Sequence, residues 1–478
     1  MAPTRIVILG GGPGGYEAAL VAAEQGADVT VVSREGLGGN SVLWDCVPSK
    51  ALIVSAEAMG WMQSAHRLGV RLSSGADVGP RATVDMGAVM DRVQHLAQNQ
   101  SADIGKKVEA SGARIIEGVG RLAGPATVEV ECGDGKTAVV PADVVLVATG
   151  SSPRVLPFSA PDGERVFTSR ELFGLRELPE RLIVVGSGAT GAEYAHAFAR
   201  FGSDVHLVSS RDQILPSEDP DAAAVIEDSF ERWGMTIHRR RRAVGMERSA
   251  DGVRVKIGEG SGGGAAGHPD GEWIEGSHAL YCIGQVPSSA RLGLQAAGVV
   301  VADNGAIPVD PVSRTNVHTI YAAGDVTGRV MLASVAAMQG RNAMWHALGR
   351  AVAPLRWDAV AACIFTSPEV ATVGMNAADA EEAQIPVEVV SLPFTGNSRA
   401  KMAEATDGFV KIYAMRGSGT VVGGAVVADR ASELITPLSV AVHNRLTVSQ
   451  LAYAFTIYPS MGGSVQETAR LLMARQSF

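Results

Sequence analysis

The same pattern of apolar and polar positions occurs twice along the chain. Residues 5–35 align without gaps to residues 181–211. Each segment has a short apolar run typical of a buried strand, a glycine-rich turn, an alanine-rich helical pattern and a second apolar run. The repeat therefore predicts two strand–helix–strand units, each of which starts a parallel sheet.

Both predicted turns carry the spacing G-x-G-x-x-G between the strand and the helix. The glycines are Gly10, Gly12 and Gly15 in the first unit and Gly186, Gly188 and Gly191 in the second. In this setting the first glycine allows a tight turn, the second allows a close approach of pyrophosphate, and the third lets helix and strand pack. Two such units predict that the chain binds two dinucleotides. FAD with a nicotinamide dinucleotide is the pairing that forms a hydride relay.

Length and composition narrow the classes of protein. The 478 residues suggest about three domains. With 46% hydrophobic and 19% charged residues the chain is expected to be globular, and its net charge of -9 argues against a nucleic acid partner. Its apolar runs are far shorter than the roughly 18 residues that span a bilayer, so no membrane insertion is expected. Four cysteines and no apparent signal segment predict a cytoplasmic protein, and no metal site is predicted.

Further motifs follow in chain order: GLGGNSVLWDCVPSK (36–50), VVLVATGSSPR (144–154), TIYAAGDVTG (319–328), LASVAAMQGR (332–341) and FTSPEVATVG (365–374). Together with the two glycine motifs, they resemble the pyridine nucleotide-disulfide oxidoreductases, the family of dihydrolipoamide dehydrogenase and glutathione reductase. The resemblance implies an α/β fold with two Rossmann-like dinucleotide-binding domains and a C-terminal α+β dimerisation domain. The domains it implies are an FAD-binding domain in two parts (1–155 and 285–350), an NAD(P)-binding domain (156–284) and a homodimerisation domain (351–478).

The resemblance also implies the site residues. For FAD these are Gly10, Gly12, Gly15, Ser33, Lys50, Gly118, Thr149, Gly150, Gly324, Asp325 and Ala333. For NAD(P) they are Gly186, Gly188, Gly191, Glu193, Ser209, Ser210, Arg211 and Gly284. Lys50 and Glu193 match the family pair beside flavin N5, and Asp325 matches the aspartate of the ribityl chain. For Glu193, a favourable charge at a helix N-terminus is an alternative interpretation.

Two departures from the family pattern remove the groups that reduce disulfides. Ser41 stands where the first cysteine of the redox pair is expected, so Cys46 has no partner there. Near the C-terminus, Tyr458 replaces the acid-base histidine and Gly463 replaces its glutamate. The candidate catalytic residues are then Lys50, Glu193, Cys46 and Tyr458. Cys46 is interpreted as a packed side chain, with a flavin-tuning thiolate as the alternative.

These features predict an FAD-dependent NAD(P)H oxidoreductase that passes two electrons directly to a diffusible quinone-type acceptor. The chain resembles the LpdA-type flavoproteins of actinobacteria, which lack disulfide chemistry and reduce quinones. A soluble pyridine nucleotide transhydrogenase is one alternative. A non-enzymatic flavoprotein that descends from a disulfide reductase is another, although the retained Lys50 and Glu193 argue against it.

The end of the second strand in the second unit bears on the choice of nucleotide. NAD-selective proteins place a carboxylate there, where it repels a 2'-phosphate. This chain has Ser209, followed by Ser210 and Arg211, so NADPH should be accepted at least as well as NADH. The basic run Arg239–Arg242 is interpreted as solvated surface along one strand, with an anion site left as the alternative.

Overall fold

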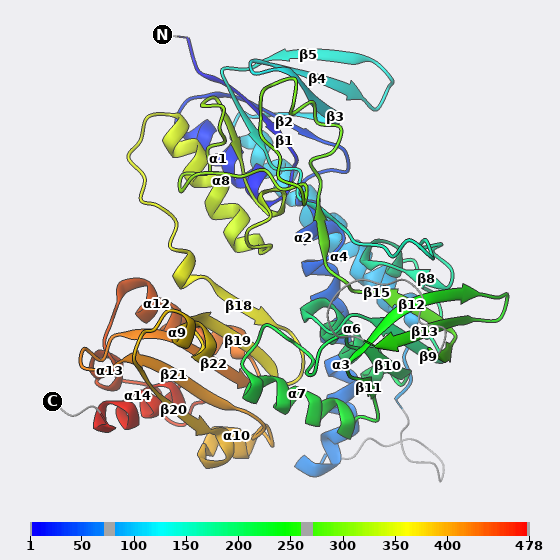
Figure 1. Cartoon of the computed structure of the whole chain (residues 1–478), viewed down its shortest axis with the longest axis vertical. Coiled ribbons are helices and arrows are strands. Elements are labelled where there is room, and N and C mark those ends of the chain that lie inside the picture. The colour runs from blue at the N-terminus through cyan, green and yellow to red at the C-terminus, as the bar shows by residue number, and fades with distance from the viewer. Residues whose placement is uncertain (1, 71–81, 260–270, 476–478) are drawn as a thin grey trace.

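The computed structural model describes residues 2–70, 82–259 and 271–475. Its main sheets lie in three lobes, one at the top, one at the lower right and one at the lower left (Figure 1). The two repeated segments start the sheets of the upper and lower right lobes, and the C-terminal residues form the lower left lobe. The predicted arrangement of two Rossmann-like sheets and a third α+β lobe is confirmed.

The upper lobe is built on a seven-stranded sheet whose first five strands are parallel. In spatial order the strands are β17 (Ile320–Ala322), β6 (Val144–Val147), β1 (Arg5–Leu9), β2 (Asp28–Ser33), β3 (Arg114–Gly124), β4 (Thr127–Cys132) and β5 (Thr137–Pro141). Helices α1 (Pro13–Glu24) and α8 (Ala333–Ala347) contact each other closely, since a Cβ on Gly340 would lie 2.1 Å from the carbonyl oxygen of Gly14. The sheet therefore combines strands from the start of the chain with β17, which lies about 300 residues later.

The lower right lobe is built on a five-stranded parallel sheet. Its spatial order is β11 (Thr236–His238), β10 (Asp204–Val208), β9 (Arg181–Val185), β15 (His278–Tyr281) and β8 (Val166–Phe167). The helices of this lobe are α5 (Ser169–Leu172), α6 (Ala189–Phe201) and α7 (Pro220–Arg232). An antiparallel sheet of β12 (Arg241–Arg248), β13 (Val253–Glu259) and β14 (Glu272–Gly276) packs beside it, and a ribbon of β7 (Ser151–Pro153) and β16 (Gln285–Pro287) leads back to the upper lobe.

The lower left lobe is built on a five-stranded antiparallel sheet. Its order is β18 (Ala361–Ile364), β19 (Glu369–Gly374), β22 (Val421–Ala428), β21 (Phe409–Met415) and β20 (Val387–Pro393). Its helices are α9 (Ala377–Glu382), α10 (Ser398–Met402), α11 (Ala431–Leu434), α12 (Thr436–Asn444), α13 (Val448–Ala452) and α14 (Gly463–Arg475). Short 3-10 helices occur at several places along the chain: η1 (Ala65–Leu68) after α3, η2 (Asp325–Thr327) after β17, η3 (Trp357–Ala359) before β18 and η4 (Phe394–Gly396) after β20.

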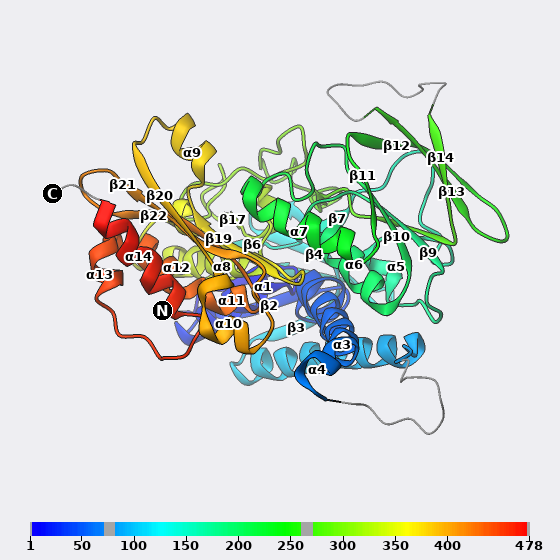
Figure 2. The ribbon, with the colours of Figure 1, turned by 90° about the horizontal axis from the view of Figure 1, so that it is seen from below.

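Three helices link the upper lobe to the lower ones. They are α2 (Gly39–Leu43), α3 (Cys46–Ser64) and α4 (Met86–Ala110). Helices α3 and α4 contact each other, and α3 also contacts α6 of the lower right lobe (Figures 1 and 2). Helix α3 therefore carries residues of the first dinucleotide unit to the second.

A cluster of charged groups around the buried Lys411 and Asp219 joins the two lower lobes. The Lys411 ammonium on β21 donates to both carboxylate oxygens of Asp219 at 2.8 Å and to Asp221 at 2.5 Å, at the start of α7. The Tyr413 hydroxyl also donates to Asp219. Since a buried charge without a partner is strongly destabilising, this cluster fixes the position of α7 against the antiparallel sheet.

The expectation that Arg239–Arg242 lie along one strand is wrong. Arg239 and Arg240 lie between β11 and β12, and Arg240 takes a left-handed φ of 55° that reverses the chain. Arg241 and Arg242 start β12 and are exposed. The run is therefore a turn followed by a strand, and the alternation argument holds only for its second half.

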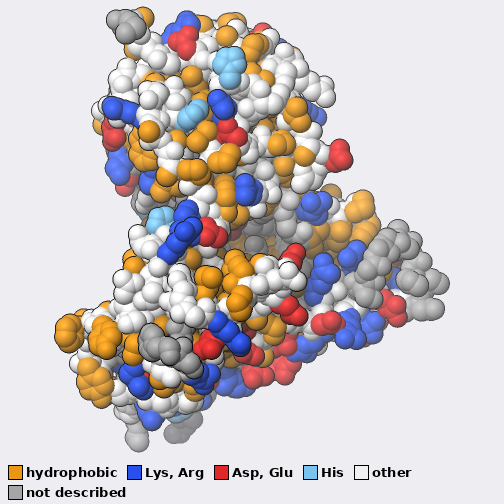
Figure 3. Space-filling model, turned by 60° about the vertical axis from the view of Figure 1, so that its left-hand side comes forward, with side chains coloured by type: hydrophobic (Ala, Val, Ile, Leu, Met, Phe, Trp, Pro, Cys, Tyr) orange, Lys and Arg blue, Asp and Glu red, His pale blue; other side chains and the backbone are white. Residues whose placement is uncertain are grey.

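No helix within the described residues is long and apolar enough to cross a membrane. In the space-filling view, acidic and basic side chains are intermixed over the lower lobes, whereas hydrophobic side chains gather at the lower left edge (Figure 3).

Candidate functional site

The first glycine motif forms a tight turn between β1 and α1. Gly10 has a φ of 109°, and a Cβ there would lie 2.2 Å from the carbonyl oxygen of Ala148. A Cβ on Gly15 would lie 1.9 Å from the carbonyl oxygen of Gly10. Only glycine fits at these two positions, because the turn and the helix meet without space for a side chain.

The second motif repeats this geometry between β9 and α6. Gly186 has a φ of 111°, and a Cβ there would lie 2.2 Å from the carbonyl oxygen of Cys282. A Cβ on Gly191 would lie 1.8 Å from the carbonyl oxygen of Gly186. Gly284, with a φ of 94°, follows on the same loop as Cys282. The duplicated sequence therefore gives a duplicated backbone turn.

The middle glycine of each motif faces open space. A Cβ on Gly188 would meet no atom within 4 Å, and one on Gly12 would meet only the Cα of Gly39 at 3.9 Å. Both residues are the N-caps of their helices, and neither helix has a side chain that caps its first N–H groups. Free N–H groups, a positive helix end and space for close approach are what a pyrophosphate needs, so both turns fit a dinucleotide.

An ion pair connects the two dinucleotide units. The Lys50 ammonium on α3 donates to Glu193 Oε2 on α6 at 2.7 Å, and Glu193 is buried. The other carboxylate oxygen of Glu193 accepts from the backbone N–H of Phe365 at 3.0 Å, and the Lys50 ammonium lies 4.8 Å from the centroid of the Phe365 ring. Burial alone would lower the pKa of Lys50, but the charge and the hydrogen bond of Glu193 outweigh it and raise that pKa. Lys50 is therefore held as a cation.

Two acidic groups at the start of α3 have raised pKa values. Burial, with a smaller contribution from Asp45, raises the pKa of the Cys46 thiol to about 11. Burial also raises the pKa of Asp45 to about 6, although Lys50 opposes the shift. The Asp45 side chain does not cap α3. At neutral pH Cys46 is a thiol, which agrees with its interpretation as a packed side chain.

The predicted flavin residues near α8 lie on adjoining loops. Asp325 starts η2, and its carboxylate accepts a hydrogen bond from the Ser151 hydroxyl at 2.7 Å. Burial raises the pKa of Asp325. The Thr149 hydroxyl donates to the carbonyl oxygen of Ser288 at 2.8 Å, and Gly150 has a φ of 67°. This loop therefore lies beside the ribityl aspartate implied by the resemblance.

The N-terminus of α8 is open. Gly324, whose φ of 80° allows the turn before η2, donates its N–H to Gln339 Oε1 at 2.8 Å. Ala333 is the first residue of α8, and no side chain caps this helix. The positive end of α8 is therefore free to face a negative group, as predicted for the pyrimidine of the flavin.

Two predicted FAD residues have local roles of their own. The Ser33 hydroxyl, at the end of β2, donates to the carbonyl oxygen of Gly36 at 2.5 Å. A Cβ on Gly118 would lie 2.4 Å from the carbonyl oxygen of Glu131 on the neighbouring strand β4. The pairing of β3 with β4 explains Gly118 without a cofactor, so its contact with FAD stays a prediction.

The residues predicted to choose the nucleotide follow β10. Ser209 is fully buried, and its hydroxyl accepts a hydrogen bond from the Ser187 hydroxyl at 2.8 Å. Ser210 is partly exposed and Arg211 is exposed. Ser209 therefore supports the loop, while Ser210 and Arg211 are accessible to a ligand.

The remaining predicted residues do not join the cluster around Lys50. Tyr458 lies on the segment between α13 and α14 and is 86% exposed. Among the hydrogen bonds and ion pairs of the described residues, none joins Tyr458 to Lys50 or Glu193. All four cysteines are free, and the Ser41 hydroxyl donates to the carbonyl oxygen of Gly38 at 2.9 Å.

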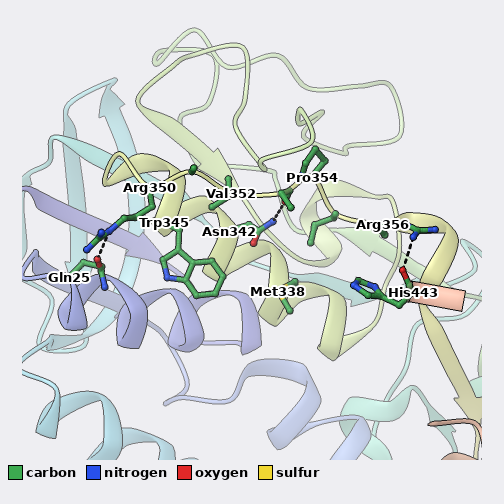
Figure 4. Close-up of a pocket in the computed structure, with 12 residues that line it drawn as sticks. Gln25, Met338, Asn342, Trp345, Arg350, Val352, Pro354, Arg356 and His443 are labelled. Carbon is green, nitrogen blue, oxygen red and sulfur yellow. Dashed lines mark hydrogen bonds between the residues drawn. The ribbon is translucent and has the colours of Figure 1, made fainter. Parts of the chain in front are cut away.

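A cavity of about 500 Å³ lies elsewhere, between α8 and the segment that leads to the lower left lobe (Figure 4). Arg350 donates to Gln25 at one end, and Arg356 donates to the carbonyl oxygen of His443 at the other. Trp345 and Met338 supply part of its apolar wall. None of the predicted site residues lines this cavity, so it is separate from the candidate site.

Comparisons with known proteins agree with this architecture. The sequence signature of the pyridine nucleotide-disulphide oxidoreductases matches residues 4–340, and that of their dimerisation domain matches residues 360–469. The chain belongs to the pyridine nucleotide-disulphide oxidoreductase family. Enzymes of this family act with FAD and NAD(P)H, in agreement with the two dinucleotide turns.

Individual members of the family extend the comparison. The chain is 46% identical to a protein of Mycobacterium tuberculosis named NAD(P)H dehydrogenase (quinone), over 98% of this chain and 94% of that one. It is 34% identical to the dihydrolipoyl dehydrogenase of Haloferax volcanii, over 98% and 95%. The crystal structure of LpdA from M. tuberculosis superposes with a TM-score of 0.91 and 46% identity, covering 98% of this chain and all of that one. The flavoprotein disulfide reductase RclA from Escherichia coli, at 23% identity and a TM-score of 0.84, shares the fold.

Sequence reasoning missed three members of the site. Phe365 lies in a recognised motif but received no role, since its contact with Glu193 uses the backbone N–H. Ser151, which binds Asp325, follows the glycine that the motif singled out. Asp45 stands directly before Cys46, and no sequence motif gave it a role. Only the burial of Asp45 makes it unusual.

Alanine substitutions at Gly188 and Gly191 should separate ligand binding from folding. Gly188→Ala puts a Cβ into open space, so the fold should persist while NADPH binding weakens about tenfold or more, because the pyrophosphate loses its close approach. Gly191→Ala forces the helix away from the turn and should destabilise the protein by about 3 kcal/mol. Thermal unfolding and NADPH titration of both variants check this. Equal effects of the two variants on stability would contradict it.

The raised pKa of the partly buried Asp45 carboxyl predicts a pH-dependent stability. Because its pKa is raised to about 6, the folded state holds the proton more tightly than the unfolded state, where the value is about 4. Stability should therefore fall as pH rises from about 4 to about 6. Asp45→Asn should lose this slope and be about 1 to 3 kcal/mol more stable than the parent above pH 6. Urea unfolding at several pH values measures it.

Asp228→Asn serves as the control, because Asp228 lies on an exposed face of α7. It should leave the slope unchanged. Parallel pH profiles for the parent and Asp45→Asn would show that the Asp45 carboxyl is not desolvated.

Proposed function

We propose that this chain is an FAD-dependent NAD(P)H oxidoreductase that passes two electrons to a quinone-type acceptor without a redox-active disulfide. The observation that carries the proposal is the intact ion pair of Lys50 and Glu193 at the junction of the two dinucleotide units, in a chain that lacks the groups of dithiol chemistry. The 46% identical protein named NAD(P)H dehydrogenase (quinone) supports the choice of acceptor.

The missing groups argue against disulfide reduction on chemical grounds. Thiol–disulfide exchange needs a thiolate and a resolving thiol. Here the Cys46 thiol has a pKa of about 11, and the position of its expected partner holds Ser41. A group that protonates a leaving thiolate near neutral pH is also needed, and the phenol of Tyr458 replaces the expected histidine.

The residues of this chain would hold FAD and a nicotinamide nucleotide in the two turns. When bound, FAD supplies the two-electron chemistry that connects the nucleotide to the acceptor. NAD(P)H gives up a hydride, and the quinone gains two electrons and two protons, one of which comes from solvent, to become a hydroquinone. With a flavin bound, the Lys50 ammonium would stabilise negative charge on it and the N-terminus of α8 would add positive potential, while Glu193 keeps Lys50 protonated.

The choice of nucleotide follows from the loop after β10. No carboxylate stands at Ser209, and Arg211 offers an exposed cation. We therefore expect NADPH to be accepted at least as well as NADH.

A second copy of the chain is part of the proposal. Four large apolar side chains on the segment 453–458 are more than three-quarters exposed: Tyr453, Phe455, Ile457 and Tyr458. Such a surface in a region that matches a dimerisation domain favours a homodimer. The role of Tyr458 in catalysis requires that second copy, since Tyr458 does not contact Lys50 within one chain. The domain boundaries and the cytoplasmic location stay predictions.

The acceptor is tested with purified FAD-loaded protein. After anaerobic reduction by NADPH, addition of a benzoquinone should reoxidise the flavin with multiple turnovers, whereas lipoamide and glutathione disulfide should not. Ser41→Cys should not restore lipoamide reduction, since the acid-base group is still missing and such groups act as a unit. Lipoamide turnover at a rate near the quinone rate would refute the proposal. Reduction of an NAD analogue by NADPH, faster than that of quinone, would favour a transhydrogenase.

The role of Lys50 is tested before any acceptor is added. Lys50→Met should slow NADPH-dependent bleaching of the flavin about 10- to 100-fold, because the site loses the cation that stabilises developing negative charge. FAD content and NADPH affinity should stay close to those of the parent. Stopped-flow absorbance measures the rate, with Lys50→Arg as the variant that retains the charge. An unchanged rate in Lys50→Met would remove Lys50 from the reaction.

A further inference from the structure

The basic turn Arg239–Arg242 lies directly against the loop after β10. The backbone N–H of Ser209 donates to the carbonyl oxygen of His238 at 3.0 Å. The N–H of Arg241 donates back to the carbonyl oxygen of Ser209 at 2.8 Å, and that of Arg240 donates to the carbonyl oxygen of Arg211 at 3.0 Å. The backbone of Arg241 is therefore hydrogen-bonded to Ser209, the residue that stands where Rossmann domains recognise the 2'-substituent of the adenine ribose.

The arginines of this turn differ in their partners. Arg239 binds Glu227 at 2.8 Å and Glu231 at 2.9 Å, and Arg240 forms an ion pair with Asp212. Arg241, Arg242 and Arg211 are exposed, and their side chains have no ion pair or hydrogen bond to any of the residues that the structure describes. The pairing of Arg240 with Asp212 also offsets the carboxylate that would otherwise repel a phosphate from this loop.

The alternation of side chains along β12 separates the two unpaired arginines of the turn. Ala243 is buried in the apolar cluster that contains Val185 and Val208 of the parallel sheet. Arg241, two residues earlier, lies on the same face as Ala243, and Arg242 lies on the opposite face. Arg241 therefore faces the sheet whose strand ends carry Gly186 and Ser209, and Arg242 faces away from it.

We propose that Arg241, together with Arg211, binds the 2'-phosphate of NADPH and is a specificity-determining residue of this enzyme. The proposal rests on the proposed use of NADPH and adds to it a residue from a different strand than the dinucleotide motif. A guanidinium offers planar paired donors that match phosphate oxygens, and two of them from residues whose backbones adjoin Ser209 form a cationic site for a phosphate monoester. NADH lacks this phosphate and gains nothing from Arg241.

The test measures binding directly and needs no electron transfer. Calorimetric titration of the FAD-loaded protein compares 2',5'-ADP, which carries the phosphate, with 5'-AMP, which does not. In Arg241→Ala the affinity for 2',5'-ADP should fall about tenfold while that for 5'-AMP is unchanged. Arg242→Ala, from the opposite face, should leave both affinities within about twofold, and Arg241→Lys should recover part of the loss.

Several outcomes would overturn the proposal. They are equal losses in Arg241→Ala and Arg242→Ala, a loss of 5'-AMP affinity as large as that of 2',5'-ADP, or a parent protein that binds both ligands equally. Competition by inorganic phosphate that is equally strong in the parent and in Arg241→Ala would assign the anion to another site. Failure of quinone reduction would leave these titrations unaffected, so the binding site and the acceptor are tested separately.

Discussion

The ion pair between Lys50 and Glu193 is the contact on which the arrangement of the site depends. Lys50 comes from α3 and Glu193 from the second dinucleotide unit, and Glu193 also accepts the N–H of Phe365 from the third lobe. Because Glu193 is buried, its charge is balanced by the Lys50 ammonium and the Phe365 N–H rather than by solvent. One carboxylate therefore binds two other segments of the chain at the place where the two cofactors are proposed to meet.

Burial favours the uncharged forms of Cys46 and Asp45, whereas the neighbouring Lys50 stays charged. This difference sets the chemistry of the site. Burial keeps Cys46 as a thiol and raises the pKa of Asp45 to about 6, because both groups lose solvation when they ionise. Lys50 stays charged in the same surroundings, because Glu193 compensates for the lost solvent. A site with a fixed cation and no thiolate stabilises negative charge on a reduced cofactor, and it is poorly suited to attack a disulfide.

The duplicated unit shows how one local geometry takes on two tasks. A Cβ on any of the outer glycines would lie within 2.5 Å of a backbone carbonyl oxygen, and the two copies match in this respect. The copies differ after their second strands. The Ser33 hydroxyl is hydrogen-bonded within its own loop. Ser209 is instead hydrogen-bonded to Ser187, and its carbonyl oxygen accepts the N–H of Arg241. The glycine turn is thus common to both units, and we infer that the segments beside it decide which dinucleotide each unit binds.

The sequence by itself determined both dinucleotide turns and the family, because the geometry of a strand, a turn and a helix is decided within about thirty residues by where glycine is required. It also indicated that Lys50 and Glu193 belong together. Only the tertiary structure decided the surroundings of Asp45, the N–H of Phe365 as a partner of Glu193, and the place of Arg241 next to Ser209. These features depend on contacts between segments far apart in the chain, and burial or a backbone hydrogen bond between such segments leaves no pattern in the local sequence.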